Sequence, residues 1–248
     1  MTPRLEACYF ASDPVVNNQM ERMARVLEYS ARLHCPDWTV NVRRIPVERQ
    51  PPTRSKEAHV ANTQKLEYWN GLVQGAAEGE CILLIDTDMV ITRPLDALWA
   101  EPFDLAYTLR DSFMYPFNGG VVALRVSPAV QAFVARWANE NQRMLADRTY
   151  HKAWQAQFGG INQAAFGRML ALHDASPLSE HLHLRTLPCV EWNCEDSAWK
   201  HYDPDLTRIV HLKGRLRRAV FTSTKDQDLA PLVARWKGIE AEALAGKT

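Results

Sequence analysis

The hydrophobic pattern of the first 45 residues changes its period twice. Residues 5–11 are mostly apolar and run into Ser12-Asp13-Pro14, which is typical of a strand followed by a loop. Apolar side chains then recur at helical spacing until about His34, at Val16, Met20, Met23 and Leu27. Residues 38–45 (WTVNVRRI) alternate between apolar and polar, as a half-buried strand does. The pattern predicts a strand, an amphipathic helix and a second strand.

A further helix and strand follow a loop marked by Pro46, Pro51 and Pro52. The helix carries its apolar face at Leu66, Trp69, Val73 and Ala76. Gly79 interrupts this period before residues 81–85 (CILLI), an apolar run typical of a strand buried on both faces. Strands that alternate with helices pack as a parallel sheet covered by helices. We therefore predict the α/β class, with a mostly parallel central sheet flanked by helices.

Shorter elements are predicted from residue 93 onward. The sequence predicts a short helix from Arg93, a strand over 104–108, a Gly119-Gly120 turn into a strand over 121–124, a helix opened by Pro128, another from Gly159-Gly160 through about Leu170, strands over 183–187 and 207–212, and a final amphipathic helix with Leu232, Trp236, Ile239 and Ala243. There is no internal repeat, low-complexity tract or long linker. We therefore predict a single domain over residues 1–248.

Composition excludes several classes of protein. The chain is 46% hydrophobic and 23% charged, which is ordinary for a soluble globular protein. The 29 basic residues balance the 29 acidic ones, so no overall field favours nucleic acid or an acidic membrane. The five cysteines lack CxxC spacing, which favours reduced thiols over a disulfide frame or a zinc site. No signal-peptide core or apolar run of about 20 residues is present, so we expect a cytoplasmic protein without a transmembrane segment.

Two acidic residues, Asp86 and Asp88, directly follow the apolar strand over 81–85. In α/β sheets, ligands bind at the carboxyl ends of strands, where these two carboxylates lie. A divalent cation would offset their mutual repulsion and accept their hard oxygen atoms. The structural alternative is that one acid caps the helix near Pro94 and the other is solvated. Because the pair follows a buried strand, we favour a functional site.

Two enzyme classes share this local pattern. In phosphatases of the haloacid-dehalogenase type, a strand-borne DxD supplies an aspartyl nucleophile and a general acid. In GT-A nucleotide-sugar transferases, the DxD holds a metal against a diphosphate. The phosphatase motif usually opens its chain and needs a later acidic pair, for which Glu195-Asp196 is a weak candidate. Here about 80 residues of α/β sequence precede the DxD, as the transferase requires.

Several segments, in the same order, resemble the family 8, glycogenin-like glycosyltransferases. The matching segments are TQKLEYWNGL with Lys65, Asp86-Thr87-Asp88, FNGGVVAL with Asn118, GGINQAAF with Asn162-Gln163, LPCVEWN with Trp192-Asn193, and IVHLKGRLRR with His211, Lys213 and Gly214. Together with the N-terminal strand and the segment FASDPVVNN, which offers Asp13, they run from about residue 5 to 218. The resemblance implies a GT-A fold, with residues 1–90 as the nucleotide-binding half and 91–248 as the sugar and acceptor half.

The resemblance also implies a donor site and a metal site. Asp86, Asp88 and His211 would bind the metal, and an imidazole beside two carboxylates suits Mn²⁺ better than Mg²⁺. The donor, a nucleotide-sugar and most simply a UDP-sugar, would contact Ala11, Asp13, Lys65, Asp86, Thr87, Asp88, Lys213 and Gly214. We interpret the basic run at 215–218 as a solvated face outside the site.

Catalysis in this family proceeds with retention of anomeric configuration, and its glutamine lies near the reacting carbon. Gln163 is the residue here that matches this glutamine. We predict that Gln163, Asn162 and Asn118 hydrogen-bond the sugar. The family has an aspartate where this chain has Asn162, so negative charge beside the reacting sugar is lost. A saccharide or other acceptor would bind loops near 145–158 and 172–202, where Tyr150, Trp154 and Trp199 are candidate stacking residues.

Three alternatives to the retaining transferase stay open. A same-fold enzyme could invert configuration with an acid as base, the candidates being Asp111, Glu191, Glu195 and Asp196. The chain could also be a Mg²⁺-dependent phosphatase of the dehalogenase type. The substitution at Asn162 further admits a nucleotide-sugar-binding protein without catalytic activity.

Overall fold

The structure is a computed structural model that describes residues 2–10, 14–46, 54–110, 116–175, 182–195, 198–222 and 227–246. The chain divides into two compact units. Unit 1 comprises Pro46–Leu84 and Phe103–Thr186, and unit 2 comprises Thr2–Ile45, Ile85–Pro102 and Leu187–Thr248. Each unit therefore contains residues from both predicted halves of the chain, 1–90 and 91–248.

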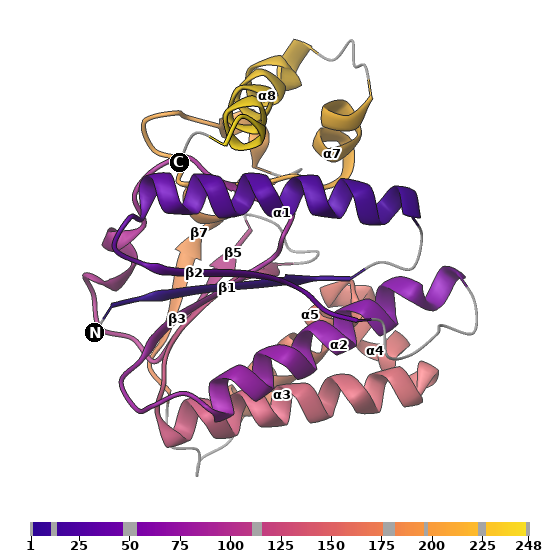
Figure 1. Ribbon diagram of the computed structural model, residues 1–248. Coiled ribbons are helices and arrows are strands. Elements are labelled where there is room, and N and C mark those ends of the chain that lie inside the picture. Colours follow the sequence, from indigo (N-terminus) through magenta and orange to yellow (C-terminus); the bar gives the residue numbers. More distant parts are fainter. Residues whose placement is uncertain are drawn as a thin grey trace. The chain divides into compact units, whose positions relative to one another are not determined.

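Unit 1 is built from four strands and four helices in its described part. The strands are β3 (Cys81–Ile85), β5 (Leu105–Leu109), β6 (Phe117–Arg125) and β7 (Leu184–Pro188), hydrogen-bonded in the order β3-β6-β5-β7. The helices are α2 (Arg54–Gln74), α3 (Pro128–Ala146), α4 (Arg148–Phe158) and α5 (Ile161–Ala175). Strands β5 and β6 pair antiparallel. Helices α2 and α3 lie side by side (Figure 1).

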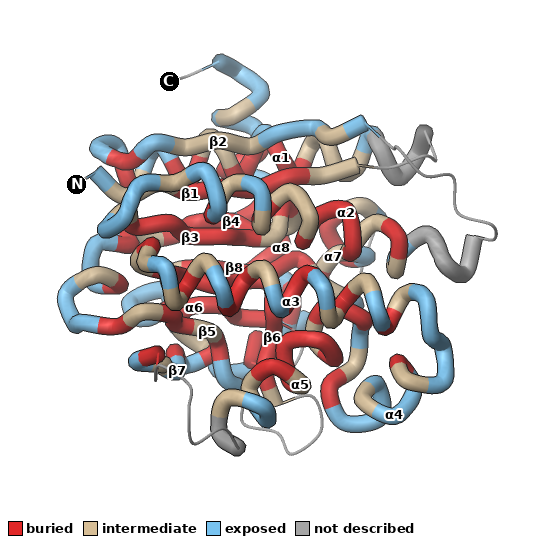
Figure 2. The backbone as a smooth tube through the Cα atoms, turned by 90° about the horizontal axis from the view of Figure 1, so that it is seen from below, coloured by how far each residue is buried: buried red, intermediate tan, exposed pale blue. Residues whose placement is uncertain are grey.

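Burial explains why β3 and β6 carry almost no polar side chains. All five residues of β3 are buried, as are the first eight of β6, and both strands are red in Figure 2. Helix α3 covers them with Trp137, whose ring lies 6.3 Å from Trp69 of α2 and 4.8 Å from Phe166 of α5. Burying a large aromatic side chain stabilises the fold by about 1.5–3 kcal/mol. These three rings form the centre of the core of unit 1.

In unit 2, the first helix of the chain packs on the last one. Its elements are β1 (Arg4–Tyr9), α1 (Pro14–His34), β2 (Thr39–Arg44), β4 (Met89–Ile91), η1 (Asp96–Trp99), α6 (Cys189–Trp192), η2 (Trp199–His201), β8 (Ile209–His211), α7 (Gly214–Phe221), η3 (Gln227–Leu229) and α8 (Ala230–Leu244). Strands β1 and β2 are parallel, and β4 and β8 are antiparallel. Helix α1 contacts α8, where Arg22 forms an ion pair of 2.7 Å with Glu240.

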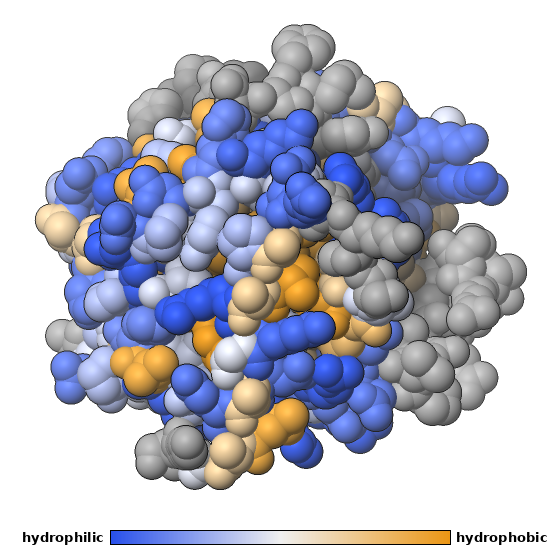
Figure 3. All heavy atoms as spheres, turned by 90° about the horizontal axis from the view of Figure 1, so that it is seen from above, coloured by the Kyte–Doolittle hydropathy of each residue, from blue (hydrophilic) through white to orange (hydrophobic). Residues whose placement is uncertain are grey.

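Apolar side chains on the described surface are scattered. The face drawn in Figure 3 is mostly hydrophilic, with apolar residues in small groups. The exposed large apolar side chains belong to five separate segments, at Leu33, Leu109, Leu172, Leu206 and Leu244. Within the described ranges, no helix has both the length and the apolar composition that a membrane span requires.

The predicted fold class, a mostly parallel α/β sheet flanked by helices, is confirmed. Two local predictions were wrong. The Gly119-Gly120 pair belongs to strand β6 and is not a turn: the register between β5 and β6 shifts at these residues, and the pairing resumes at Asn118 and Phe117. The predicted acceptor loop over 145–158 is mostly helix α4, which Asp147 caps by accepting hydrogen bonds from the N–H groups of Thr149 and Tyr150.

Candidate active site

The Asp86-Thr87-Asp88 sequence forms a bend between β3 and β4. Thr87 is buried, and its hydroxyl donates a hydrogen bond of 2.9 Å to the carbonyl oxygen of Cys8 at the end of β1. This bond fixes the centre of the bend. The flanking carboxylates stay partly exposed, with 23% of the Asp86 side chain and 16% of the Asp88 side chain accessible. Thr87 therefore holds the two acids in place, and its hydroxyl is hydrogen-bonded within the protein.

His211 reaches these acids because β4 and β8 pair antiparallel. Met89, which directly follows Asp88, is paired with His211. The N–H of Leu212 donates a hydrogen bond of 2.7 Å to the carbonyl oxygen of Asp88. Residues 122 and 124 positions apart in the chain are thus joined by a short ladder of backbone hydrogen bonds. The pairing confirms that the DxD and the strand-borne histidine lie together.

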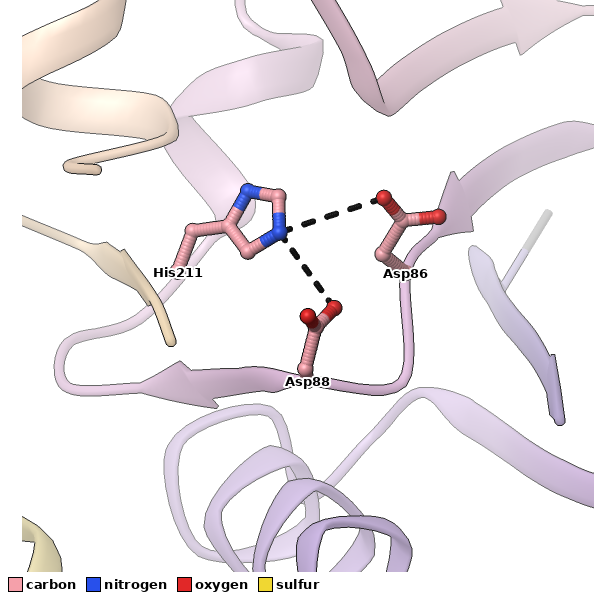
Figure 4. A group of neighbouring side chains, drawn as sticks. All are labelled: Asp86, Asp88 and His211. Carbon is pink, nitrogen blue, oxygen red and sulfur yellow. Dashed lines mark ion pairs between the residues drawn. The ribbon is translucent and has the colours of Figure 1, made fainter. Parts of the chain in front are cut away.

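Three acceptor groups converge at this point, as Figure 4 shows. Nε2 of His211 lies 3.3 Å from Oδ1 of Asp88 and 3.9 Å from Oδ2 of Asp86. One ligand atom from each of the three residues lies within 4.8 Å of the others. In the described part of the chain, this is the one cluster of three or more His, Cys, Asp or Glu side chains that could hold a metal.

The charge of Asp88 is compensated inside the protein. Burial on its own raises the pKa of the Asp88 carboxyl, but His211 and then Arg217 lower it further than burial raises it. Nη1 of Arg217, on helix α7, lies 3.7 Å from Oδ2 of Asp88. The net pKa is therefore below the usual value, and the carboxylate is ionised at neutral pH. An ionised carboxylate is the form that a cation requires.

The donor set fits a divalent metal. Two carboxylates and one imidazole offer two hard oxygen ligands and one nitrogen ligand, a combination that divalent metal ions accept. His211 is 3% exposed, and its second ring nitrogen, Nδ1, lies 2.9 Å from Oδ1 of Asn193. A ligating histidine is commonly held in this way through its other nitrogen.

A tight turn follows His211 and opens helix α7. The N–H of Lys213 donates a hydrogen bond of 2.8 Å to the carbonyl oxygen of His211. Gly214, the first residue of α7, has a φ of +53°, a conformation that glycine adopts without strain. The N-terminus of a helix attracts anions through its unpaired N–H groups. Lys213 and Gly214 thus lie close in the chain to the metal-ligand candidate His211, at a helix end suited to phosphate.

The remaining predicted site residues that the structure describes belong to unit 1. Lys65 lies on α2, and its Nζ is 4.5 Å from the centroid of the Trp69 ring. Asn118 lies on β6, where its Oδ1 accepts a hydrogen bond of 3.0 Å from the N–H of Gly120. Gln163 lies in the first turn of α5, and its Nε2 donates 3.1 Å hydrogen bonds to the carbonyl oxygens of Phe117 and Phe158.

Asn162 carries the least satisfied polar side chain of this group. It is 7% exposed, and neither its Oδ1 nor its Nδ2 has a hydrogen-bond partner among the described residues. Nδ2 of Asn118 is likewise buried without a partner in that part of the chain. A buried polar group without a partner costs about 1–3 kcal/mol, so such groups commonly mark a ligand or water site.

Several predicted residues lie outside the described part of the chain, namely Ala11, Asp13, Asp111 and Asp196. Of the other acids considered as bases for an inverting enzyme, Glu191 accepts a 2.8 Å hydrogen bond from Nε of Arg208, and Glu195 is 3% exposed. Glu191 therefore already has a charged partner within the protein.

The aromatic residues suggested for acceptor stacking are used within the protein. Trp154 has Phe158 stacked at 6.0 Å and the guanidinium of Arg168 at 5.1 Å from its ring centroid. Trp199 is 4% exposed and has the guanidinium of Arg215 at 5.4 Å. The ring of Tyr150 has the guanidinium of Arg143 at 4.1 Å. Intramolecular packing therefore accounts for all three.

The sequence did not indicate two residues that contact the candidate metal ligands. Arg217 belongs to the basic run that we interpreted as a solvated face, yet it pairs with Asp88. Asn193 was part of a matched segment, but nothing in its neighbourhood predicted the contact with His211. The available signal for Arg217 was its position in the first turns of a helix that directly follows the histidine strand.

Comparison with solved structures assigns the fold. A glycosyltransferase involved in glycosylation of the major capsid of PBCV-1 matches 96% of this chain and 100% of its own, with a TM-score of 0.58 and 11% identity. The galactosyltransferase LgtC, solved with donor and acceptor sugar analogues, matches 96% of this chain and 95% of its own, with a TM-score of 0.56 and 12% identity.

A third neighbour is GlyE, a glycosyltransferase from Streptococcus pneumoniae. It matches 99% of this chain and 64% of its own, with a TM-score of 0.52 and 16% identity. No protein-family model matches the sequence, and no curated protein matches it. The chain thus has the GT-A glycosyltransferase fold, as the sequence resemblance predicted.

Proposed function

We propose that this protein is a metal-dependent glycosyltransferase of the family 8 type that uses a nucleotide-sugar donor, most simply a UDP-sugar. The observation that carries the proposal is the convergence of Asp86, Asp88 and His211 directly after the buried strand β3. The fold supports it, because the solved structures of the same fold are glycosyltransferases. The phosphatase alternative has no comparable support.

In this proposal the leaving group is the nucleoside diphosphate. A divalent cation at Asp86, Asp88 and His211 would act as a Lewis acid that stabilises the departing charge. Arg217 offers a guanidinium beside this site, and a guanidinium binds phosphate through paired hydrogen bonds. Lys213 and the N–H groups at the start of α7 would contact further phosphate oxygens. All of these residues belong to unit 2.

The sugar would be bound by the carboxamides of Asn118, Asn162 and Gln163. A carboxamide donates and accepts hydrogen bonds but neither ionises nor attacks as a strong nucleophile at neutral pH. These residues therefore suit recognition of hydroxyl groups, and the unpaired atoms of Asn162 and Asn118 leave such bonds to be made. We propose retention of configuration, in which the diphosphate itself helps to deprotonate the acceptor, so no protein base is needed.

The proposed function is tested by a thermal-shift panel of nucleotide sugars, each with and without Mn²⁺. We expect Mn²⁺ and a UDP-sugar together to raise Tm well above either alone, since ligands that bind the folded state stabilise it. GDP-, ADP- and CMP-linked sugars serve as controls for the base. Release of phosphate from simple phosphomonoesters with Mg²⁺, without any nucleotide-sugar effect, would instead identify a phosphatase. Donor binding without turnover for any acceptor would identify a binding protein.

Replacing Arg217 by glutamine is expected to change two affinities in opposite directions. The variant lacks the positive charge of Arg217 beside Asp88, so Mn²⁺ alone should bind up to about fivefold more tightly. The size follows from the contribution of a partly exposed ion pair, which is about 1 kcal/mol or less. UDP with saturating Mn²⁺ should bind about 10–100-fold more weakly, because a charge-assisted hydrogen bond contributes about 1.5–3 kcal/mol. Isothermal titration calorimetry measures both constants.

The matched control for this pair of titrations is Arg218→Gln, on the neighbouring exposed residue of the same helix. It should leave both affinities at the wild-type values. If Arg217→Gln lowered the affinities for both Mn²⁺ and UDP, or lowered neither, the role assigned to Arg217 would be wrong.

A further inference from the structure

Asn193 lies in a backbone arrangement that places it beside His211. It directly follows helix α6, and the next residue, Cys194, forms a parallel bridge with Val210 of β8. The N–H of Cys194 donates to the carbonyl oxygen of Ile209, and the N–H of His211 donates to that of Cys194, both at 2.9 Å. These bonds hold the Asn193 backbone against the strand that ends at His211. The Asn193 side chain is fully buried.

The contact between the two side chains favours one tautomer of the histidine. Oδ1 of Asn193 lies 2.9 Å from Nδ1 of His211. An amide oxygen only accepts hydrogen bonds, so the ring nitrogen that faces it is the donor. A neutral imidazole has a single N–H, and its lone pair is therefore on Nε2. Nε2 is the nitrogen that faces Asp86 and Asp88.

Without an acceptor at Nδ1, the neutral ring would prefer the opposite tautomer. Oδ1 of Asp88 lies 3.3 Å from Nε2, and an N–H on Nε2 would form a charge-assisted hydrogen bond with it. In that tautomer Nε2 has no lone pair to give to a metal. The buried side chain of Asn193 opposes this outcome, because its Oδ1 accepts a hydrogen bond from an N–H on Nδ1.

We propose that Asn193 is a positioning residue that holds His211 in the Nδ1–H tautomer, with Nε2 directed at a divalent cation. The inference rests on the proposed metal site and adds the residue that makes the histidine competent to bind there. Contacts of this kind contribute about 10–100-fold to metal affinity in proteins. The Asn193–His211 contact lies wholly within unit 2.

The test is the Mn²⁺ affinity of the full-length protein without nucleotide, measured by electron paramagnetic resonance. Asn193→Leu, which removes the acceptor at similar volume, should bind Mn²⁺ about 10–100-fold more weakly. Asn193→Asp keeps an acceptor at the same place and should stay within a few-fold of wild type. Asn141→Leu is the matched control, because Asn141 is also fully buried and hydrogen-bonded, to Thr63 of unit 1. It should lower Tm and leave the Mn²⁺ affinity unchanged.

A double-mutant cycle separates positioning from general damage. In a His211→Ala background, Asn193→Leu should cause no further loss of Mn²⁺ affinity, since there is no ring left to orient. A further loss there, or an unchanged affinity in the single Asn193→Leu variant, would overturn the inference. If the wild type itself fails to bind Mn²⁺, the metal site of the proposed function is wrong instead.

The tautomer gives a readout that needs no metal. In protein labelled with ¹⁵N at histidine, long-range ¹H–¹⁵N spectra recorded at alkaline pH distinguish the two neutral forms. The wild type should show a larger fraction of His211 protonated at Nδ1 than Asn193→Leu does. Equal fractions in the two proteins would contradict the assignment, whatever the metal affinity.

Discussion

Asp88→Asn is expected to lower the Mn²⁺-dependent activity on the donor by about 10³-fold or more. The substitution keeps the shape of the side chain but removes the charge that the bound cation requires, and metal charge stabilisation contributes several kcal/mol. Asp88 is paired with the guanidinium of Arg217, and the neutral asparagine side chain cannot supply the negative charge that the substitution removes. The measurement is release of UDP from the best donor of the panel, with and without Mn²⁺.

The control for this variant is Asp96→Asn, another carboxylate of unit 2. Oδ1 of Asp96 accepts a 3.0 Å hydrogen bond from Nε1 of Trp38, which an asparagine amide oxygen can still accept. Its activity should equal that of the wild type. Full Mn²⁺-dependent activity of Asp88→Asn would show that the metal ligands have been misassigned.

Trp137→Ala is expected to lower the free energy of unfolding by about 3–5 kcal/mol. Trp137 is fully buried, contacts the rings of Trp69 and Phe166, and leaves a large cavity when truncated. Its Nε1 also donates a 3.1 Å hydrogen bond to the carbonyl oxygen of Asn162, in the first turn of α5. A loss of this size is a large part of the roughly 5–15 kcal/mol that stabilises an ordinary domain. Urea unfolding followed by circular dichroism measures it.

Comparison with Trp137→Phe separates the cavity from the hydrogen bond. Phenylalanine keeps most of the ring contacts but loses the bond to Asn162, whose net contribution is about 1 kcal/mol. The urea midpoint of Trp137→Phe should therefore lie between those of Trp137→Ala and the wild type. A wild-type midpoint for Trp137→Ala would contradict the account of this core.

The sequence predicted the parts of the fold that have a strong local pattern. The apolar run of β3 and the helical period of α1 both reflect burial, which follows directly from side-chain chemistry. Helix α4 was missed because its apolar stripe is thin, with only His151 and Phe158 buried. The aspartate that caps it, Asp147, is nevertheless a helix-start signal that can be recognised in the sequence.

The glycines of β6 show how tertiary packing can override a local signal. Gly119 and Gly120 together suggest a turn, since glycine is unfavourable within a strand. Here a Cβ at position 119 would lie 3.7 Å from Cγ of Gln163, so this part of the strand runs close against the first turn of α5. Asn118 and Val122, on either side of the glycines, pair with β5, and the whole segment is buried, so the two glycines lie at an irregularity within the strand.

The metal-ligand candidates were predicted better than their surroundings. A DxD after a buried strand and a histidine on a later strand can both be recognised in the sequence, and the structure brings them together. The contacts of Asn193 and Arg217 depend on a single strand bridge and on the course of α7. Such contacts have no local pattern, because they are set by where distant segments pair.

The most direct test of the central claim is a calorimetric titration of UDP into the wild-type protein, with and without Mn²⁺. If Asp86, Asp88 and His211 hold a cation against a diphosphate, the affinity for UDP should rise at least about tenfold when Mn²⁺ is present, which corresponds to about 1.4 kcal/mol. The affinity for uridine, which has no phosphate, should not change. Equal affinity for UDP in both conditions would contradict the proposed metal-dependent donor site.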